Sequence, residues 1–223
     1  SSAASDVYKR QAPEDEAMEF EEKMEVDVKV DSVRELCKLR DSARLKKVLD
    51  EIEIFINKPA RKTSEMLGNL ESDPEYQLIV EANNVAADID NEISLIHKFV
   101  KDKYQKRFPE LDSLIMGEID YIKAVKELGN DLDSAKNNEI LQQILTQATI
   151  MIVSVTASTT QGQPLSEKEL NQINEACNMA TEINDFKIKI FDYVESKMTF
   201  IAPNLSAIVG ASTAAKLVGL AGG

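Results

Sequence analysis

The side chains most often found in metal centres and nucleophilic sites are rare in this chain, which has one histidine and two cysteines in 223 residues. Cys37 and Cys177 stand far apart, whereas structural zinc sites need clustered pairs of Cys and His. We therefore expect no metal and no cofactor, and two reduced, buried thiols rather than a disulfide. His97 lies between Ile96 and Lys98 without a serine or cysteine motif beside it. A structural role for His97 is favoured over a catalytic one.

Other catalytic patterns are equally weak. The acidic side chains are numerous but scattered over solvated helical faces, so no carboxylate pair stands out for acid–base catalysis. Residues 219–223 are glycine-rich, but they lack the preceding strand and the Gly-Lys-Ser/Thr ending of a phosphate-binding loop. The residues predict a protein that is not an enzyme.

Cations are concentrated in one short run. A contact with phosphate or with an acidic partner is one interpretation. The interpretation that we favour is that they are attracted to the negative C-terminal end of a helix. A smaller group, of Lys58, Arg61 and Lys62, has the same two interpretations. The members of the main run are Lys98, Lys101, Lys103, Lys106 and Arg107.

The net charge of −13 is unevenly distributed. Residues 12–31 carry nine acidic and two basic side chains, which predicts a disordered, acidic lead-in over residues 1–31. Within it, residues 1–11 resemble a translated adapter sequence and are left out of the fold prediction. Residues 32–223 carry twenty-nine acidic and twenty-two basic side chains, so the composition does not support a strongly basic nucleic-acid-binding surface.

Helical periodicity runs through the remainder of the chain and predicts an all-α fold. A first helix is expected from Ser32, where Ser32 and Glu35 form a capping-box pattern, and it should fade near Pro59. A polar connector completes this N-terminal region, residues 32–73. Asp73-Pro74-Glu75 is a strong signal for the start of the next helix.

Two long helices form the centre of the prediction. Their apolar residues alternate in steps of three and four, which predicts an antiparallel coiled-coil hairpin over residues 74–201. Lys187 and Lys197 interrupt the second stripe, which indicates an exposed pair of helices rather than a deep core. The isoleucines of the expected seam are Ile79, Ile89, Ile93 and Ile96 on the first helix, and Ile173, Ile183 and Ile190 on the second.

A helical tip, residues 109–165, should join the two helices. Residues 117–128 are expected to form a helix that ends at Gly129-Asn130. Residues 140–155 again follow helical spacing, although their β-branched run, 150–155, could instead be a strand. After Pro164, Ser166 and Glu169 make a further capping box for the second long helix.

The last segment, residues 199–223, is rich in Gly, Ala and Ser. Small side chains such as Gly210 and Ala211 allow a neighbouring element to approach closely, at a cost of about 1 kcal/mol for each glycine inside a helix. Pro203, Asn204 and Lys216 interrupt its apolar character, so we expect a core helix and no membrane partner.

Several separated motifs resemble one family. Residues 201–206, IAPNLS, resemble the opening helix of the Nop domain, which is found in scaffolds of spliceosomal and nucleolar ribonucleoproteins. Residues 104–111, YQKRFPEL, and residues 121–130, YIKAVKELGN, resemble two further family motifs. Residues 210–217, GASTAAKL, stand where nucleolar members have a GELVGARLI-like stretch. This variant is similar to the U4/U6 branch of the family, as are LRDS at 39–42, IHKF at 96–99 and VTASTTQGQ at 155–163. The resemblance covers residues 32–223.

The resemblance implies a fold and a function. The chain would end early in a Nop domain, at the first helix of that domain, residues 202–223. The residues implied for this start are Ala202, Pro203, Asn204, Gly210, Ala211 and Lys216. The implied protein is a nuclear scaffold that helps assemble the U4/U6·U5 tri-snRNP. Its implied partners are U4 small nuclear RNA with its kink-turn-binding protein, reached mostly through residues outside this chain, and other tri-snRNP proteins.

Two alternatives remain open. One is a nucleolar scaffold of box C/D ribonucleoproteins. The other is a helical protein unrelated to RNA that dimerises through its heptad seams.

Overall fold

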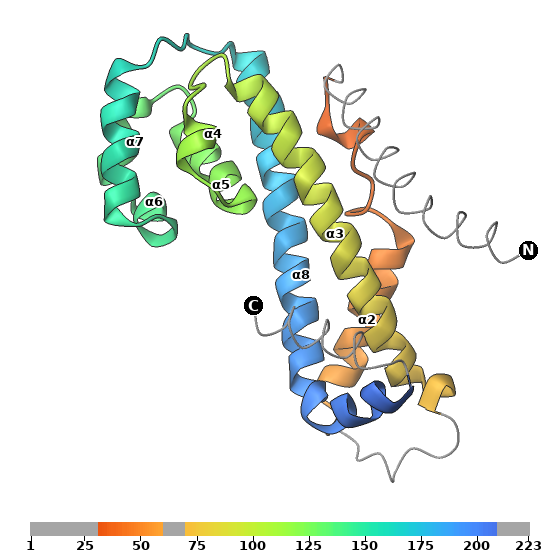
Figure 1. Cartoon of the computed structure of the whole chain (residues 1–223). Helices are drawn as coiled ribbons and strands as arrows, with labels where there is room; N and C mark the ends of the chain where they lie inside the picture. The colour runs from red at the N-terminus through yellow and green to blue at the C-terminus, as the bar shows by residue number, and fades with distance from the viewer. Residues whose placement is uncertain (1–30, 60–69, 209–223) are drawn as a thin grey trace, which may run out of the picture. The chain divides into compact units, whose positions relative to one another are not determined.

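The computed structural model describes residues 31–59 and 70–208 (Figure 1). Every regular element in these two ranges is helical, and the prediction of an all-α fold is confirmed. The described residues form two compact units. Unit 1 contains residues 31–37 and 94–178, and unit 2 contains residues 38–59, 70–93 and 179–208. Helices α3 (Pro74–Tyr104) and α8 (Glu167–Ile208) contribute a segment to each unit.

The first helix begins later than the sequence predicted. Ser32 caps only the short 3-10 helix η1 (Val33–Glu35), and α2 (Ala43–Ile56) begins after Ser42, whose Oγ accepts a hydrogen bond from the Leu45 N–H at 3.2 Å. Before Ser42, the backbone N–H groups of Lys38 and Leu39 donate hydrogen bonds to a side chain of α3. Glu92 Oε1 accepts from the N–H groups of Lys38 and Leu39, at 3.2 and 3.1 Å. A long-range carboxylate therefore replaces the helical partners that these donors would otherwise need.

Unit 2 packs α2 beside the first part of α3 (Figure 1). The start of α3 matches the predicted signal, because the Asp73 carboxylate accepts hydrogen bonds from the N–H groups of Glu75 and Tyr76. The short 3-10 helix η3 (Leu70–Ser72) precedes this cap. The buried face of α2 consists of Leu45, Val48 and Ile52.

Unit 1 contains the tip between the long helices. Its elements are α4 (Leu111–Leu114), α5 (Glu118–Leu128), η4 (Leu132–Asn137), α6 (Glu139–Ile144) and α7 (Gln147–Thr159). The β-branched run 150–155 is thus helical, and Thr146 caps α7 by accepting a hydrogen bond from the Thr149 N–H. The alternative of a strand is excluded.

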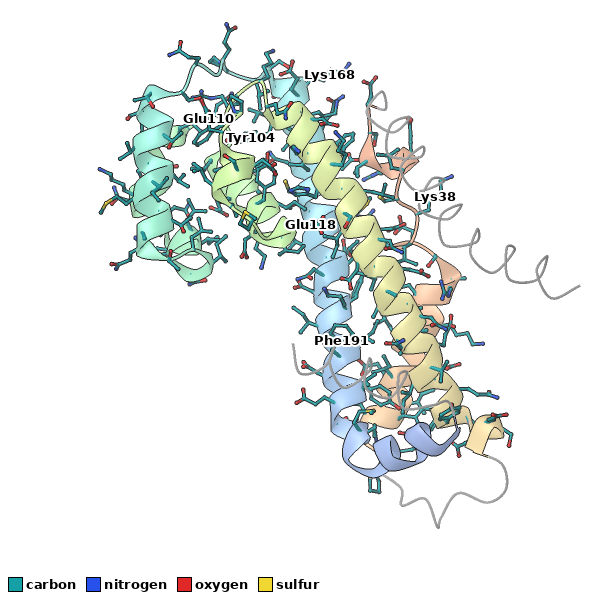
Figure 2. The ribbon with its side chains drawn as sticks, viewed as in Figure 1. Lys38, Tyr104, Glu110, Glu118, Lys168 and Phe191 are labelled. Carbon is teal, nitrogen blue, oxygen red and sulfur yellow. The ribbon has the colours of Figure 1, made fainter. Side chains whose placement is uncertain are left out.

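Large aromatic side chains fill the core of unit 1. Tyr104, Phe108 and Tyr121 are almost fully buried. The Tyr104 hydroxyl donates a hydrogen bond to the Gly129 carbonyl at 2.8 Å (Figure 2). Gly129 follows α5 with φ of 51°, a backbone conformation that glycine adopts without strain. The predicted end of α5 at Gly129 is confirmed.

The loop before α8 is held by a side chain that bonds to its backbone and by close packing of its backbone. The Asn130 side chain donates to the Leu165 carbonyl and accepts from the Leu165 N–H, at 2.9 and 2.8 Å. Gly162 lies so close to the Arg107 carbonyl that a Cβ at this position would be 1.7 Å from its oxygen. Glycine is therefore required here by space. Ser166 and Glu169 then form the predicted reciprocal capping box of α8, at 3.2 and 3.4 Å.

Among the described residues, no helix combines the length and the apolar character needed to cross a membrane.

Candidate functional site

The seam isoleucines lie inside their units. In unit 2, Ile79, Ile89, Ile183 and Ile190 are fully buried and Ile93 nearly so. In unit 1, Ile96 and Ile173 are buried as well. The seam therefore belongs to the hydrophobic interior of each unit.

Side-chain contacts give the direction of the two helical segments in unit 2. Lys187 Nζ lies 2.7 Å from Asp90 Oδ1, and the Tyr193 hydroxyl donates to Glu75 Oε1 at 3.1 Å. Residue numbers rise along α3 as they fall along α8, so the segments are antiparallel. In unit 1, Lys106, which follows α3, lies with its Nζ 3.0 Å from Oε1 of Glu169 in the first turn of α8.

The expectation that Lys187 and Lys197 mark an exposed helix pair is wrong. Lys197 and Glu75 are each 3% exposed, and Lys197 Nζ lies 3.4 Å from Glu75 Oε1. The ammonium also donates to the carbonyls of Phe55 and Lys58, at 3.1 and 2.8 Å. One carboxylate and two carbonyls thus satisfy the charge, which allows a lysine to occupy a core position. Lys187 remains partly exposed beside Asp90.

We call Lys197, Glu75 and Tyr193 the buried lysine cluster. It connects the end of α2, the first turn of α3 and the last part of α8. Sequence reasoning noticed Lys197 only as an interruption of the stripe and missed its carboxylate partner. The position of Lys197 in the heptad could have indicated such a partner, since a lysine at a core position needs a buried anion.

The basic run at the end of α3 is engaged within unit 1. Lys98 pairs with Asp102 and Lys101 with Asp112, at 2.8 and 3.3 Å. The Lys103 ammonium lies 5.1 Å from the centre of the Phe99 ring. Lys106 pairs with Glu169, and the Arg107 guanidinium donates to the Asn130 carbonyl at 2.8 Å. These intramolecular contacts argue against a phosphate site, while the attraction of the run to the end of the helix stays a prediction.

His97 also has a structural environment. Its Nε2 lies 3.3 Å from Asp112 Oδ1, and its ring makes an edge contact with Tyr121, with the centroids 5.0 Å apart. Glu118 of α5 (labelled in Figure 2) lies with its Oε2 3.9 Å from His97 Nδ1, and its Oε1 accepts a hydrogen bond from the Ser94 hydroxyl at 3.0 Å. These contacts hold α3 against α4 and α5.

The two cysteines are buried thiols that form no disulfide, as the sequence predicted. Burial raises the pKa of the Cys177 thiol to about 12, which keeps it protonated at physiological pH. Burial also raises the pKa values of Tyr104 and Tyr121. Among the described residues, no group of three or more His, Cys, Asp or Glu side chains is placed to hold a metal ion.

The residues implied for the start of the Nop domain lie on both sides of residue 208, the last residue that the structure describes. Ala202, Pro203 and Asn204 lie within α8. Gly210, Ala211 and Lys216 lie outside the described residues, as do Arg61 and Lys62.

The sequence analysis missed a surface on the tip. The helix α7 contains no charged residue, and it exposes Met151, Ile152 and Val155. The sequence predicted only that these side chains follow helical spacing, not which of them are exposed. The signal that could have found the surface is the absence of charged residues from α7, which leaves the helix without a charged face to mark its solvent side.

Comparison with known proteins identifies the family to which the chain is similar. Residues 85–223 match the Nop family, described as "snoRNA binding domain, fibrillarin". The chain is similar to the U4/U6 small nuclear ribonucleoprotein Prp31 of Xenopus laevis, with 59% identity over 205 residues, and to that of Homo sapiens, with 58%. Each of these alignments covers 92% of this chain and 41% of the relative.

A more distant relative is nucleolar. The probable nucleolar protein 5-2 of Arabidopsis thaliana is 31% identical over 147 residues, which are 66% of this chain and 27% of that protein. The chain therefore spans about two fifths, or less, of the length of these relatives. Because the family match covers more than half of it, the chain belongs to the Nop family.

Proposed function

We propose that this protein is a non-enzymatic ribonucleoprotein scaffold of the spliceosome and that it acts in the nucleus. The observation that carries the proposal is the similarity to U4/U6 small nuclear ribonucleoproteins over 92% of the chain. The function would be to help assemble the U4/U6·U5 tri-snRNP in pre-mRNA splicing. Its RNA target would be the kink-turn of U4 small nuclear RNA together with the protein that binds that kink-turn first.

The proposed division of labour follows the order of the chain. Residues 74–201 would act as an antiparallel spacer, with the tip, residues 109–165, available to other tri-snRNP proteins. Residues 202–223 would open the module that approaches RNA. Two features support this assignment: the charge of the chain is acidic, and the cations at the end of α3 are engaged within unit 1. Direct RNA contact by residues 32–201 is therefore not part of the proposal.

A binding experiment tests this placement of the RNA site. A preformed complex of kink-turn RNA and its primary binding protein is titrated with this chain and with a form extended through the rest of the Nop module. We expect the extended form to bind the complex and the 223-residue chain to bind at least a hundredfold more weakly. Equal binding by the two forms would refute the placement.

A nucleolar box C/D scaffold is the second candidate, because the chain also resembles a nucleolar protein. The two candidates differ in the small RNA with which they associate. Purification of the extended protein from nuclei, followed by sequencing of the RNA, distinguishes them: U4 supports the spliceosomal scaffold and box C/D RNA the nucleolar one.

A further inference from the structure

The outer face of α7 is an apolar stripe in a strongly charged protein. Met151 is 66% exposed, Ile152 52% and Val155 60%. Ala148 and Ser158 are exposed on the same helix. The positions 148, 151, 152, 155 and 158 repeat at intervals of three and four residues, so they share one side of the helix. A partner that buried these three large apolar side chains would gain favourable free energy, because their apolar surface would leave water.

The opposite side of α7 is already occupied. Ile150 and Val153 are buried, and α7 packs against η4, α4 and α6 within unit 1. Figure 1 shows α4 and α5 to one side of α7 and no described element on its other side. The exposed stripe is therefore separate from the core-facing stripe, and it has the periodicity of a second helix-packing face.

A groove of about 710 Å³ adjoins this stripe at Met151 and Val155. Its lining is apolar with an amide rim and a single cation: Ile150, Met151, Val155, Gln142, Gln147 and Lys136. No residue from 140 to 166 is charged. Among the residues that the structure describes, none forms an ion pair with the Lys136 ammonium.

We propose that this groove receives an amphipathic helix of another protein, with apolar residues at i, i+3, i+4 and i+7 and a carboxylate placed for Lys136. The spacing of the exposed stripe matches this mode of recognition. Apart from Lys136 the lining is uncharged, so two apolar faces can meet there without desolvation of other charges, and the one cation selects an acidic flank. The proposal rests on the proposed scaffold function, since it gives the tip a class of protein partner.

Two other occupants fit the face less well. RNA binding requires several cations for phosphate contacts, and the groove has one. A second copy of the chain would have to bury about 800 Å² on each copy to form a stable dimer, which one side of a helix of 13 residues does not supply.

The test uses the whole chain and a synthetic helix of about three heptads that carries leucine at the four apolar positions, glutamate on one flank and one tryptophan. The chain has no tryptophan, so the emission of the probe reports binding directly. We expect Met151→Glu or Val155→Glu to weaken binding at least tenfold. Lys136→Glu should weaken binding of this probe and strengthen binding of a probe with lysine on its flank. Ile188→Glu introduces the same charge at an exposed isoleucine of α8 and should change nothing.

Thermal unfolding followed by circular dichroism verifies that each variant is folded. Equal affinity for the patterned probe and for a probe with scrambled apolar positions would overturn the proposal, as would binding that is insensitive to residues 151 and 155. A dimer in sedimentation that Val155→Glu converts to a monomer would assign the face to a second copy, and that result also overturns the proposal. RNA plays no part in this assay. The Val155→Glu form of the extended protein should still bind the kink-turn complex, so failure of this inference can be distinguished from failure of the scaffold function.

Discussion

Lys197 is a charged side chain in the interior of unit 2, next to an equally buried Glu75. Its position is stable because the ammonium contacts one carboxylate and two backbone carbonyls. A buried ion pair is not by itself a large source of stability, but loss of one partner leaves the other charge uncompensated.

We therefore expect Lys197→Ala to lower the free energy of unfolding by about 3–5 kcal/mol, as measured by urea denaturation. Lys187→Ala is the matched control, since its partner Asp90 is about half exposed and the loss should stay below about 1 kcal/mol. Combining Lys197→Met with Glu75→Gln should recover part of the loss. Equal effects of the two alanine variants would show that the buried lysine cluster has no special role.

Buried acids give the protein a predictable response to alkaline pH. The pKa of Cys177 is raised from an ordinary value of 9.0 to about 12 by burial. Between these values the folded protein retains a proton that the unfolded chain has released, so a rise in pH favours unfolding. The contribution is fully present below about pH 9 and is lost as the pH rises toward 12.

Above pH 9 we expect the free energy of unfolding to fall by about 1.4 kcal/mol per pH unit from Cys177 alone. Tyr104 and Tyr121 add to the fall above about pH 10, because burial raises their pKa values too. Urea denaturation at pH 8, 9 and 10 measures the slope. Cys177→Ala should reduce the slope between pH 9 and 10, and an unchanged slope in this variant would contradict the assignment.

At the scale of elements, the antiparallel arrangement of α3 and α8 in unit 2 makes a direct prediction. In a chain without its two native cysteines, Asp90→Cys and Lys187→Cys should be joined by a short bis-maleimide within one molecule, because their native side chains are in contact at 2.7 Å. Mass spectrometry at low protein concentration detects this product. Ile89 and Ile183, one turn or less away along the two helices, should lie in the same cross-linked region.

The chain with Asp90→Cys alone is the control and should give no intramolecular product. Cross-links found only between molecules would favour the alternative in which the heptad seams pair two copies of the protein.

At the scale of the whole molecule, charge governs the behaviour toward RNA. The net charge is −13, and the cations at the end of α3 contact acidic, aromatic or carbonyl groups of unit 1. Few counterions could be released from RNA by such a surface.

We expect the 223-residue chain to show no measurable affinity for free kink-turn RNA in fluorescence anisotropy, at about 50 mM salt or at any concentration up to about 200 mM. A basic protein of similar size is the positive control for the assay. Micromolar affinity with a steep salt dependence would reveal a phosphate-binding surface that the paired cations do not predict.

The sequence anticipated the elements whose signals are local. The caps at Asp73 and Ser166 and the helix end at Gly129 were predictable, because each depends on side chains within a few residues of the backbone groups that they satisfy. The late start of α2 was not, since Glu92, far along the chain, holds the backbone of Lys38 and Leu39.

The candidate surfaces show the same division. Apolar periodicity predicted that α7 is a helix, but it could not say which apolar side chains are covered, because burial depends on the neighbours that tertiary packing supplies. Met151, Ile152 and Val155 are exposed while Ile150 and Val153 are buried, although all five belong to one apolar run.

By itself, the sequence determined the helical class, the family and the acidic character of the protein, because composition, period and motif are properties of the order of residues. Only the tertiary structure decided that Lys197 is neutralised inside unit 2 and that one face of α7 remains in contact with water. Both outcomes depend on which segments, distant in sequence, pack together. Those contacts determine the free energy of burying a charge or an apolar side chain.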